Sequence, residues 1–245
     1  TPEIQRFTTS FNHMAEELES SEMLRTDFVN NFSHEFKSPI VSIRGFAKML
    51  KYNDLTKEEY NEYLDIIISE SERLSQLATN VLNLSKVENQ TFLSSPKEYN
   101  LTEQIRLAIA MMAQKWSSKK VSFDFDCDEI SFYGNEELMN QVWINLIDNA
   151  IKFSPANDDI NMSLKCQGNT ILFTIHDNGP GMGEEVQKHI FDKFYQGNSS
   201  HTSQGNGLGL TIAYKIVKLH SGSIQVSSSQ TSGTTFEIEL SNKNP

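Results

Sequence analysis

Two asparagines and a lysine in the stretch NLIDNAIK have the chemistry to hold a metal-bound polyphosphate. Asn145 and Asn149 are four residues apart and Lys152 follows three residues later, so on a helix the three side chains project from one side. An amide oxygen can ligate Mg²⁺, and a lysine can pair with phosphate oxygens. The same spacing is typical of an ordinary solvated helix face, and taken alone that reading is the more common one.

A second candidate segment is DNGPGM, residues 177–182, which follows an alternating apolar stretch. Asp177 ends this predicted strand, where its carboxylate could accept a hydrogen bond from an adenine amino group. Gly179 and Gly181 would let the backbone come close to a ligand. The alternative is a plain turn after a strand, for which Asn-Gly alone is sufficient.

Three glycines in GNGLGL, residues 205–210, precede a predicted helix over 207–220. Backbone amides at a helix N-terminus bind phosphate, with help from the helix dipole. The segment does not fit a dinucleotide-binding motif, because no strand precedes it, nor a P-loop, because GK[ST] is missing. The polar residues 196–206 are predicted to form a mobile lid.

A histidine stands five residues before a proline in SHEFKSPI, residues 33–40. A neutral imidazole is nucleophilic near pH 7, which makes His34 chemically interesting. Pro39 cannot donate to the carbonyl of Glu35, and its ring crowds that carbonyl. The sequence therefore predicts a helix that is weakened or bent beside His34, and we expect this bend to switch the protein between activity states.

Residues 1–90 are predicted to be mostly helical. With Ile4, Phe11 and Leu18 at heptad position a, His34 falls at position c and should be exposed. Thr56 and Glu59 form a predicted capping box that starts a second amphipathic helix, which runs to about Glu88. Two such antiparallel helices make half of a four-helix bundle, and dimerisation would supply the other half. A plain coiled-coil spacer would explain the seams equally well.

The pattern changes after residue 92. A helix is predicted over residues 101–116, and a second over 134–154. Alternating segments predict five strands, namely VSFDFD, NMSLKCQ, TILFTIHDNG, GSIQVSSS and TTFEIEL. Helices on one face of a mixed or antiparallel sheet give an α+β sandwich.

Composition bounds the class of protein. With 38% hydrophobic and 22% charged residues the chain is typical of a soluble globular protein, and its net charge of −11 argues against nucleic-acid binding. The two cysteines lack metal-ligand spacing, which suggests a reducing compartment. No apolar run approaches the ~20 residues that cross a bilayer. Because the chain starts within a helical pattern, we expect it to be a fragment of a longer protein.

These motifs, in this order and spacing, resemble bacterial sensor histidine kinases of two-component systems. Asn145 and Asn149, DNGPGM, FDKFY and GNGLGL resemble their ATP-binding domain, of the type shared with gyrase and the ninety-kilodalton heat-shock chaperone. FVNNFSHEFKSPIVSIRGFAKML resembles their histidine-containing dimerisation helix, and FNHMAEEL resembles the end of a HAMP relay. The implied domains are a HAMP end over 1–25, a dimerisation and phosphotransfer domain over 26–92 and an α/β-sandwich ATP-binding domain over 93–245.

The resemblance implies a role for each matching residue. His34 would accept the phosphoryl group from ATP, Glu35 would act as general base and Ser38 would position a water for dephosphorylation of the regulator. Asn149 would ligate Mg²⁺, Asp177 would read adenine, and Thr234 would reach the adenine side through water. The full implied nucleotide-binding set is Asn145, Asn149, Lys152, Phe153, Asp177, Gly179, Gly181, Phe194, Gly205, Gly207, Leu208, Gly209 and Thr234.

The resemblance also implies partners and a location. The phosphoryl group would pass to an aspartate on the receiver domain of a response regulator. The protein would be a homodimer on the cytoplasmic side of the membrane, with a membrane-anchored parent.

Three positions depart from the family pattern. Ser38 stands where Thr or Asn is more usual, which implies weak phosphatase activity at most. Gln196 stands where many relatives have Arg, and Asn145 stands where ATP-hydrolysing cousins carry a water-activating Glu. An amide is a poor base, which favours transfer to His34 over hydrolysis. An ATPase and a non-enzymatic dimeric scaffold remain the rival interpretations.

Overall fold

The computed structural model describes residues 2–90, 92–197 and 205–242 of the chain, with most side chains before residue 28 outside the description. The chain divides into two compact units, Thr1–Thr79 and Asn80–Pro245. The boundary falls inside a helix, thirteen residues before the boundary at 92/93 that the sequence predicts.

The first unit consists of α1 (Pro2–Tyr52) and most of α2 (Lys57–Glu88). The last turns of α2 belong to the second unit. The predicted capping box is confirmed: the Thr56 N–H donates to Glu59 Oε2 at 2.9 Å, and the Glu59 N–H donates to Thr56 Oγ1 at 3.2 Å. Pro39 lies inside α1, which continues through it. The predicted weakening therefore does not end the helix.

The hairpin leaves apolar side chains exposed on both helices. Ile40 and Val41 of α1 and Ile68 of α2 are each about half exposed. Where the two helices do pack, Phe46 and Tyr63 place their ring centroids 5.2 Å apart. Apolar residues left in water on long helices are typical of a surface that a partner helix covers.

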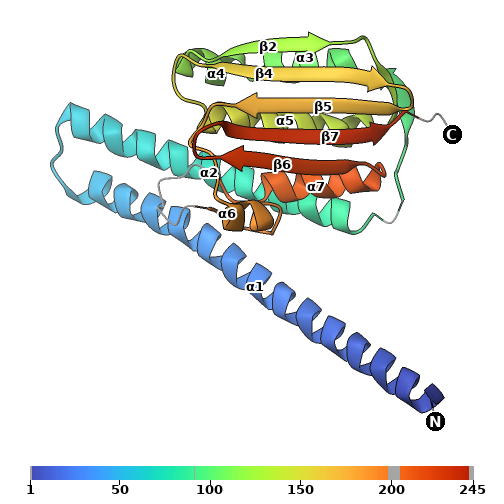
Figure 1. Cartoon of the computed structure of the whole chain (residues 1–245). Coiled ribbons are helices and arrows are strands. Elements are labelled where there is room, and N and C mark those ends of the chain that lie inside the picture. The colour runs from blue at the N-terminus through green and yellow to red at the C-terminus, as the bar shows by residue number, and fades with distance from the viewer. Residues whose placement is uncertain (1, 91, 198–204, 243–245) are drawn as a thin grey trace. The chain divides into compact units, whose positions relative to one another are not determined.

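A five-stranded mixed sheet is the centre of the second unit, in agreement with the predicted α+β sandwich (Figure 1). Its strands, in spatial order, are β2 (Ser122–Cys127), β4 (Asp159–Gln167), β5 (Thr170–Asp177), β7 (Gly233–Ser241) and β6 (Ser223–Ser229). Only the β2–β4 pair is parallel. All five predicted strands are confirmed.

Helices cover one face of this sheet in Figure 1. They are α3 (Leu101–Met111), α4 (Ala113–Lys119), α5 (Glu136–Phe153) and α7 (Gly209–Leu219). The core between the layers contains the fully buried Trp143 and Phe173, with ring centroids 4.8 Å apart. The Trp143 Nε1–H donates to Gln104 Oε1 at 2.8 Å, so the buried indole is satisfied.

Three local features differ from the sequence-based expectation. The single helix predicted over 101–116 is wrong, because Met112, at φ −97° and ψ 12°, separates α3 from α4. A two-stranded sheet of β1 (Lys97–Asn100) and β3 (Ser131–Gly134) was not predicted, nor was the short helix α6 (Glu184–His189). Among the described residues, no helix has the length and apolarity needed to span a membrane.

Candidate active site

The adenine side of the candidate site lies where β5 ends and β7 begins. Asp177 is the last residue of β5 and is paired in register with Thr234 of β7. Its side chain is almost completely buried, and its Oδ1 accepts the Gly179 N–H at 3.0 Å. Burial raises the pKa of Asp177 to about 6, although the Gly179 N–H opposes that rise.

A serine that the sequence did not single out completes this end of the sheet. The Ser228 hydroxyl donates to Gly233 O at 2.8 Å and lies 2.9 Å from Thr234 Oγ1, and its oxygen accepts the Met182 N–H at 2.8 Å. Because the Ser228 proton is used on Gly233 O, the Thr234 hydroxyl is the donor between the two side chains. Ser228 thus joins Thr234 to the loop that carries Gly179 and Gly181.

The loop after β5 needs glycine at position 181 because of its backbone angle and its close approach to β6. Gly181 has φ +66°, and a Cβ placed on it would lie only 1.8 Å from Ser229 O. Both the left-handed backbone and the close approach exclude a side chain. Gln187 of α6 also holds this loop, because its Nε2 donates to Met182 O at 2.9 Å and to Ser228 O at 2.8 Å. Neither Gln187 nor Ser228 lies in a sequence pattern that would have revealed it.

The phosphate side is formed by α5, which carries Asn145, Asn149 and Lys152 as predicted. Asn145 is partly buried, and within the described residues its Nδ2 has no hydrogen-bond partner. Lys152 is half-buried, with its Nζ 4.6 Å from the centroid of the Phe153 ring. Burial lowers the pKa of Lys152, and the charge of Asp148 opposes this.

Glycines bring a loop against α5. A Cβ on Gly209, the first residue of α7, would lie 3.2 Å from Asn145 Oδ1, and one on Gly205 would lie 2.9 Å from Lys152 Nζ. Gly207 has φ +64°, and its carbonyl accepts the Phe194 N–H at 3.0 Å. Phe194 and Leu208 are buried beneath the loop. The predicted lid over 196–206 falls largely on residues 198–204, which lie outside the described residues.

These residues fit a magnesium nucleotide. The Asn145 amide, which has no partner among the described residues, and the desolvated ammonium of Lys152 are groups that a phosphate would satisfy. The amide oxygen of Asn149 is a ligand of the kind that Mg²⁺ accepts. When bound, Mg²⁺ would offset negative charge on the transferring phosphate.

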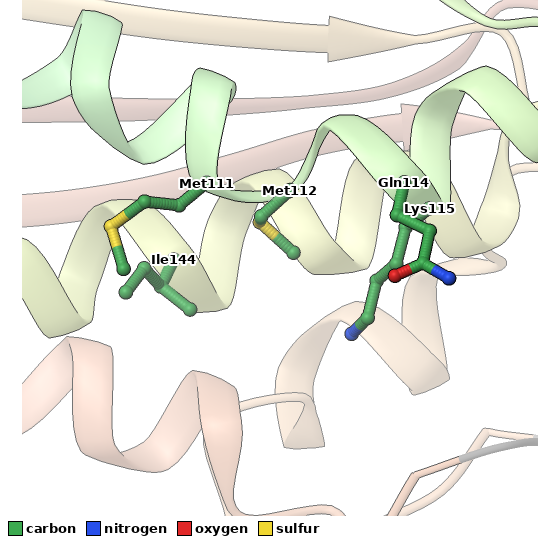
Figure 2. Close-up of a pocket in the computed structure, with 5 residues that line it drawn as sticks. All are labelled: Met111, Met112, Gln114, Lys115 and Ile144. Carbon is green, nitrogen blue, oxygen red and sulfur yellow. The ribbon is translucent and has the colours of Figure 1, made fainter.

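A separate cavity of about 300 Å³ lies between α5 and the segment where α3 meets α4 (Figure 2). Met111, Met112, Gln114, Lys115 and Ile144 line it. None of the predicted nucleotide-binding residues is among them, although Ile144 precedes Asn145 on α5.

The candidate phosphoacceptor belongs to the first unit. His34 is exposed on α1, as heptad position c predicts, and Ser38 is exposed one turn later. Glu35 accepts a hydrogen bond from Arg73 of α2, with Nη2 and Oε2 3.0 Å apart. No pattern in the sequence indicates that Glu35 has this cationic partner.

Comparison with known proteins explains why both sites occur in one chain. Residues 24–90 match the family model for the His Kinase A (phospho-acceptor) domain, and residues 134–244 match that for the histidine kinase-, DNA gyrase B- and HSP90-like ATPases. This chain belongs to the histidine kinase family. The histidine kinase fold expected from the sequence is therefore confirmed.

Relatives of this histidine kinase include the heme sensor protein HssS of Staphylococcus haemolyticus, 35% identical over 242 residues, which cover 99% of this chain and 52% of that protein. HssS of Staphylococcus aureus (strain Newman) is 32% identical over 240 residues, 98% of this chain and 52% of that protein. The chain thus spans about half the length of the curated relatives it matches.

Solved histidine kinases have the same fold. Acinetobacter baumannii AdeS aligns with a TM-score of 0.70 and 25% identity over 86% of this chain and 98% of that one. ThkA, solved in complex with the response regulator protein TrrA, aligns with a TM-score of 0.73 and 25% identity over 89% of this chain and 61% of that one.

Proposed function

We propose that this histidine kinase transfers the γ-phosphoryl group of ATP to His34 and then to an aspartate on the receiver domain of a response regulator. The observation that carries the proposal is the pairing, in one chain, of an exposed histidine on a helical hairpin with a nucleotide site whose phosphate side has amides where a hydrolase needs a base. Asn145 cannot activate water as a carboxylate does. Transfer to a protein nucleophile is therefore favoured over hydrolysis.

The second unit binds and orients the nucleotide in this proposal. Asp177 accepts from the adenine amino group, and Thr234 supports that side through water. Asn145 donates an amide N–H, which has no partner in the part of the chain that the structure describes, to a phosphate oxygen, and Lys152 adds a positive charge. Asn149 contributes an amide oxygen to Mg²⁺. The backbone of the glycine loop, residues 205–209, lies over the phosphates.

The chemical step forms a nitrogen–phosphorus bond on His34 and breaks the bond between the γ-phosphorus and the oxygen of ADP. The neutral imidazole attacks through one ring nitrogen, and the proton on the other ring nitrogen passes to Glu35. Arg73 contacts Oε2 of Glu35, and a carboxylate has a second oxygen that can accept this proton. The ion pair also fixes the direction of the carboxylate.

The remaining assignments belong to the same proposal. Residues 1–25 are a HAMP end, 26–92 the dimerisation and phosphotransfer domain, and 93–245 the ATP-binding domain. The exposed apolar residues of the hairpin support a homodimer. The parent protein would be anchored in the bacterial membrane with this part on the cytoplasmic side. Ser38 would support weak phosphatase activity toward the response regulator, the class of protein with which ThkA was solved in complex.

The test is incubation of the purified chain with γ-labelled ATP and Mg²⁺, followed by acid and alkali treatment. We expect label on the protein that is lost in acid, stable in alkali and absent from His34→Gln. The matched control is His189→Gln, an exposed histidine that should keep the label. Release of free phosphate without labelled protein would indicate an ATPase instead. Nucleotide binding with neither label nor phosphate release would indicate a scaffold.

A further inference from the structure

The last turns of α2 are part of the nucleotide-binding unit, although most of α2 belongs to the helical hairpin. The compact second unit begins at Asn80. Leu84 and Val87, in the turns that follow, are almost fully buried. An apolar stripe with spacing i, i+3 that is completely buried fixes the rotation of this part of the helix.

An ion-pair cluster fixes the end of the same segment. Glu88 Oε1 lies 2.7 Å from Lys193 Nζ and 2.9 Å from Lys215 Nζ of α7. Burial by itself raises the pKa of Glu88, but hydrogen bonds and charge from the two lysines outweigh it and the pKa falls below its usual value. The carboxylate thus stays ionised and connects α2 to the helix that begins at the glycine loop.

One hydrogen bond extends from this segment into the glycine loop itself. Asn80 is nine-tenths buried, and its Nδ2 donates to Asn206 Oδ1 at 3.2 Å. Asn206 lies between Gly205 and Gly207. The same Asn206 oxygen accepts the Leu208 N–H at 3.3 Å, immediately before α7 begins. The amide of Asn80 therefore shares an acceptor with the backbone of the loop.

We propose that Asn80 is a positioning residue for the nucleotide phosphates, acting through Asn206 on the glycine loop. The inference rests on the proposed function, because it takes residues 205–209 as the phosphate-binding loop. Asn80 does not touch the nucleotide. It holds the Asn206 oxygen where that oxygen also orients the Leu208 N–H, so that the loop is arranged for phosphate before the nucleotide arrives.

A regulatory consequence follows from the place of Asn80 on α2. The helix is continuous from Lys57 to Glu88, so a rotation or shift of its earlier turns acts directly on Asn80. Loss of the Asn80–Asn206 hydrogen bond would weaken phosphate binding and leave the adenine side at Asp177 intact. Affinity for ATP would then depend on the state of the helical hairpin.

The test compares ligands that differ in their phosphates. Asn80→Leu keeps the approximate volume of the side chain and removes the donor. Calorimetric titration of the whole 245-residue chain with ATP, ADP (both with Mg²⁺) and adenosine should show about three- to tenfold weaker binding of ATP and ADP, the range expected for one lost hydrogen bond. Adenosine affinity should change by less than about twofold. The matched control is Asn61→Leu, at an exposed position of the same helix.

Further variants test the same hydrogen bond. Asn80→Gln retains an amide donor and should recover part of the ATP affinity. Asn206→Ala alone should weaken ATP binding, and adding Asn80→Leu to it should have little further effect. If Asn80→Leu does not fold, Asn80→Ala replaces it. Equal losses for all three ligands would mean a purely structural role, and unchanged affinities would mean no role; either result overturns the inference.

The two proposals fail in distinguishable ways. A wild-type chain that binds no ATP would refute the proposed function. A wild-type chain that binds ATP and labels His34, alongside an Asn80→Leu variant that binds phosphates equally well, would refute only the role of Asn80.

Discussion

The adenine and phosphate sides of the proposed nucleotide site differ in how far the protein satisfies its own polar groups. On the adenine side, Asp177 accepts from Gly179, and Ser228 has partners in Thr234, Gly233 and Met182. On the phosphate side, the Asn145 amide has no hydrogen-bond partner among the described residues, and burial lowers the pKa of Lys152.

The two sides therefore differ in whether their polar groups are satisfied before a ligand binds. The adenine side is fixed by strand pairing and by backbone contacts, so its geometry exists before a ligand binds. The phosphate side carries buried donors that cost free energy until an anion accepts from them. Changes to the adenine side should therefore affect stability as well as binding. Changes to the phosphate side should affect mainly binding and transfer.

The largest effect is expected at the phosphate side from Asn149→Ala. Loss of the amide oxygen should lower the rate of autophosphorylation by about 10²–10³, because Mg²⁺ would lose its protein ligand. Adenosine affinity and the free energy of unfolding should stay near the wild-type values. The measurement is the initial rate of label incorporation at His34, with Asn140→Ala on the same helix as control. An equal loss of adenosine binding would contradict the separation of the two sides.

Gly181→Ala should have the next largest effect, this time on stability. The added Cβ would meet Ser229 O at 1.8 Å in a left-handed backbone, so the loop and β6 must move apart. We expect a loss of about 3 kcal/mol or more in the free energy of unfolding of the second unit.

Gly168→Ala is the matched control for that substitution, measured by denaturant unfolding. Gly168 has φ +62°, and an added Cβ would have no heavy atom within 4 Å. It should cost only the backbone strain, about 1 kcal/mol. Similar losses for the two variants would show that close packing at Gly181 is unimportant.

The phosphate side of this site could be predicted from the sequence better than the adenine side could. The shared side of Asn145, Asn149 and Lys152 was predictable because a helical period places them together on α5, although their role came from the resemblance to a family. The pairing of Asp177 with Thr234 was not derivable, because β5 and β7 are far apart in sequence and their register depends on the whole sheet. Thr234 entered only through resemblance to a family.

Residues whose roles depend on non-local contacts were missed altogether. Ser228 lies in the run SSS, where nothing distinguishes it from its neighbours, and Gln187 lies in a six-residue helix. The break at Met112 has no Gly or Pro to mark it. β1 and β3 have four residues each, too few to show a period of two.

Asp177→Asn should have a smaller effect of opposite sign on stability. The pKa rises on folding from an ordinary 3.8 to about 6, so the folded state loses stability from this group as pH rises between these values. Asparagine avoids that cost and still accepts from Gly179. We expect the variant to be more stable than wild type above pH 6.5, by at most about 3 kcal/mol, and about equal to it near pH 4.

Nucleotide binding should respond in the opposite direction. The carboxamide is a weaker acceptor than a carboxylate, so adenosine affinity should fall about tenfold. Unfolding curves at several pH values and calorimetric titration measure the two effects, with the exposed Asp124→Asn as control. A variant less stable than wild type at pH 7.5 would contradict the assigned burial cost.

The smallest effect is expected from Thr234→Val, which tests whether the adenine side behaves as one bonded unit. The substitution keeps the shape of the side chain but removes the donor to Ser228 Oγ, which retains Met182 and Gly233 as partners. The cost should be about 1 kcal/mol of stability and a two- to fivefold loss of adenosine affinity.

Thr235→Val provides the comparison, since it loses a hydrogen bond to His176 at the neighbouring position of β7. It should cost similar stability and no affinity, because side chains of adjacent strand residues point to opposite faces of the sheet. Equal affinity losses for the two variants would show that the effect comes from the strand as a whole and not from the Thr234 hydroxyl.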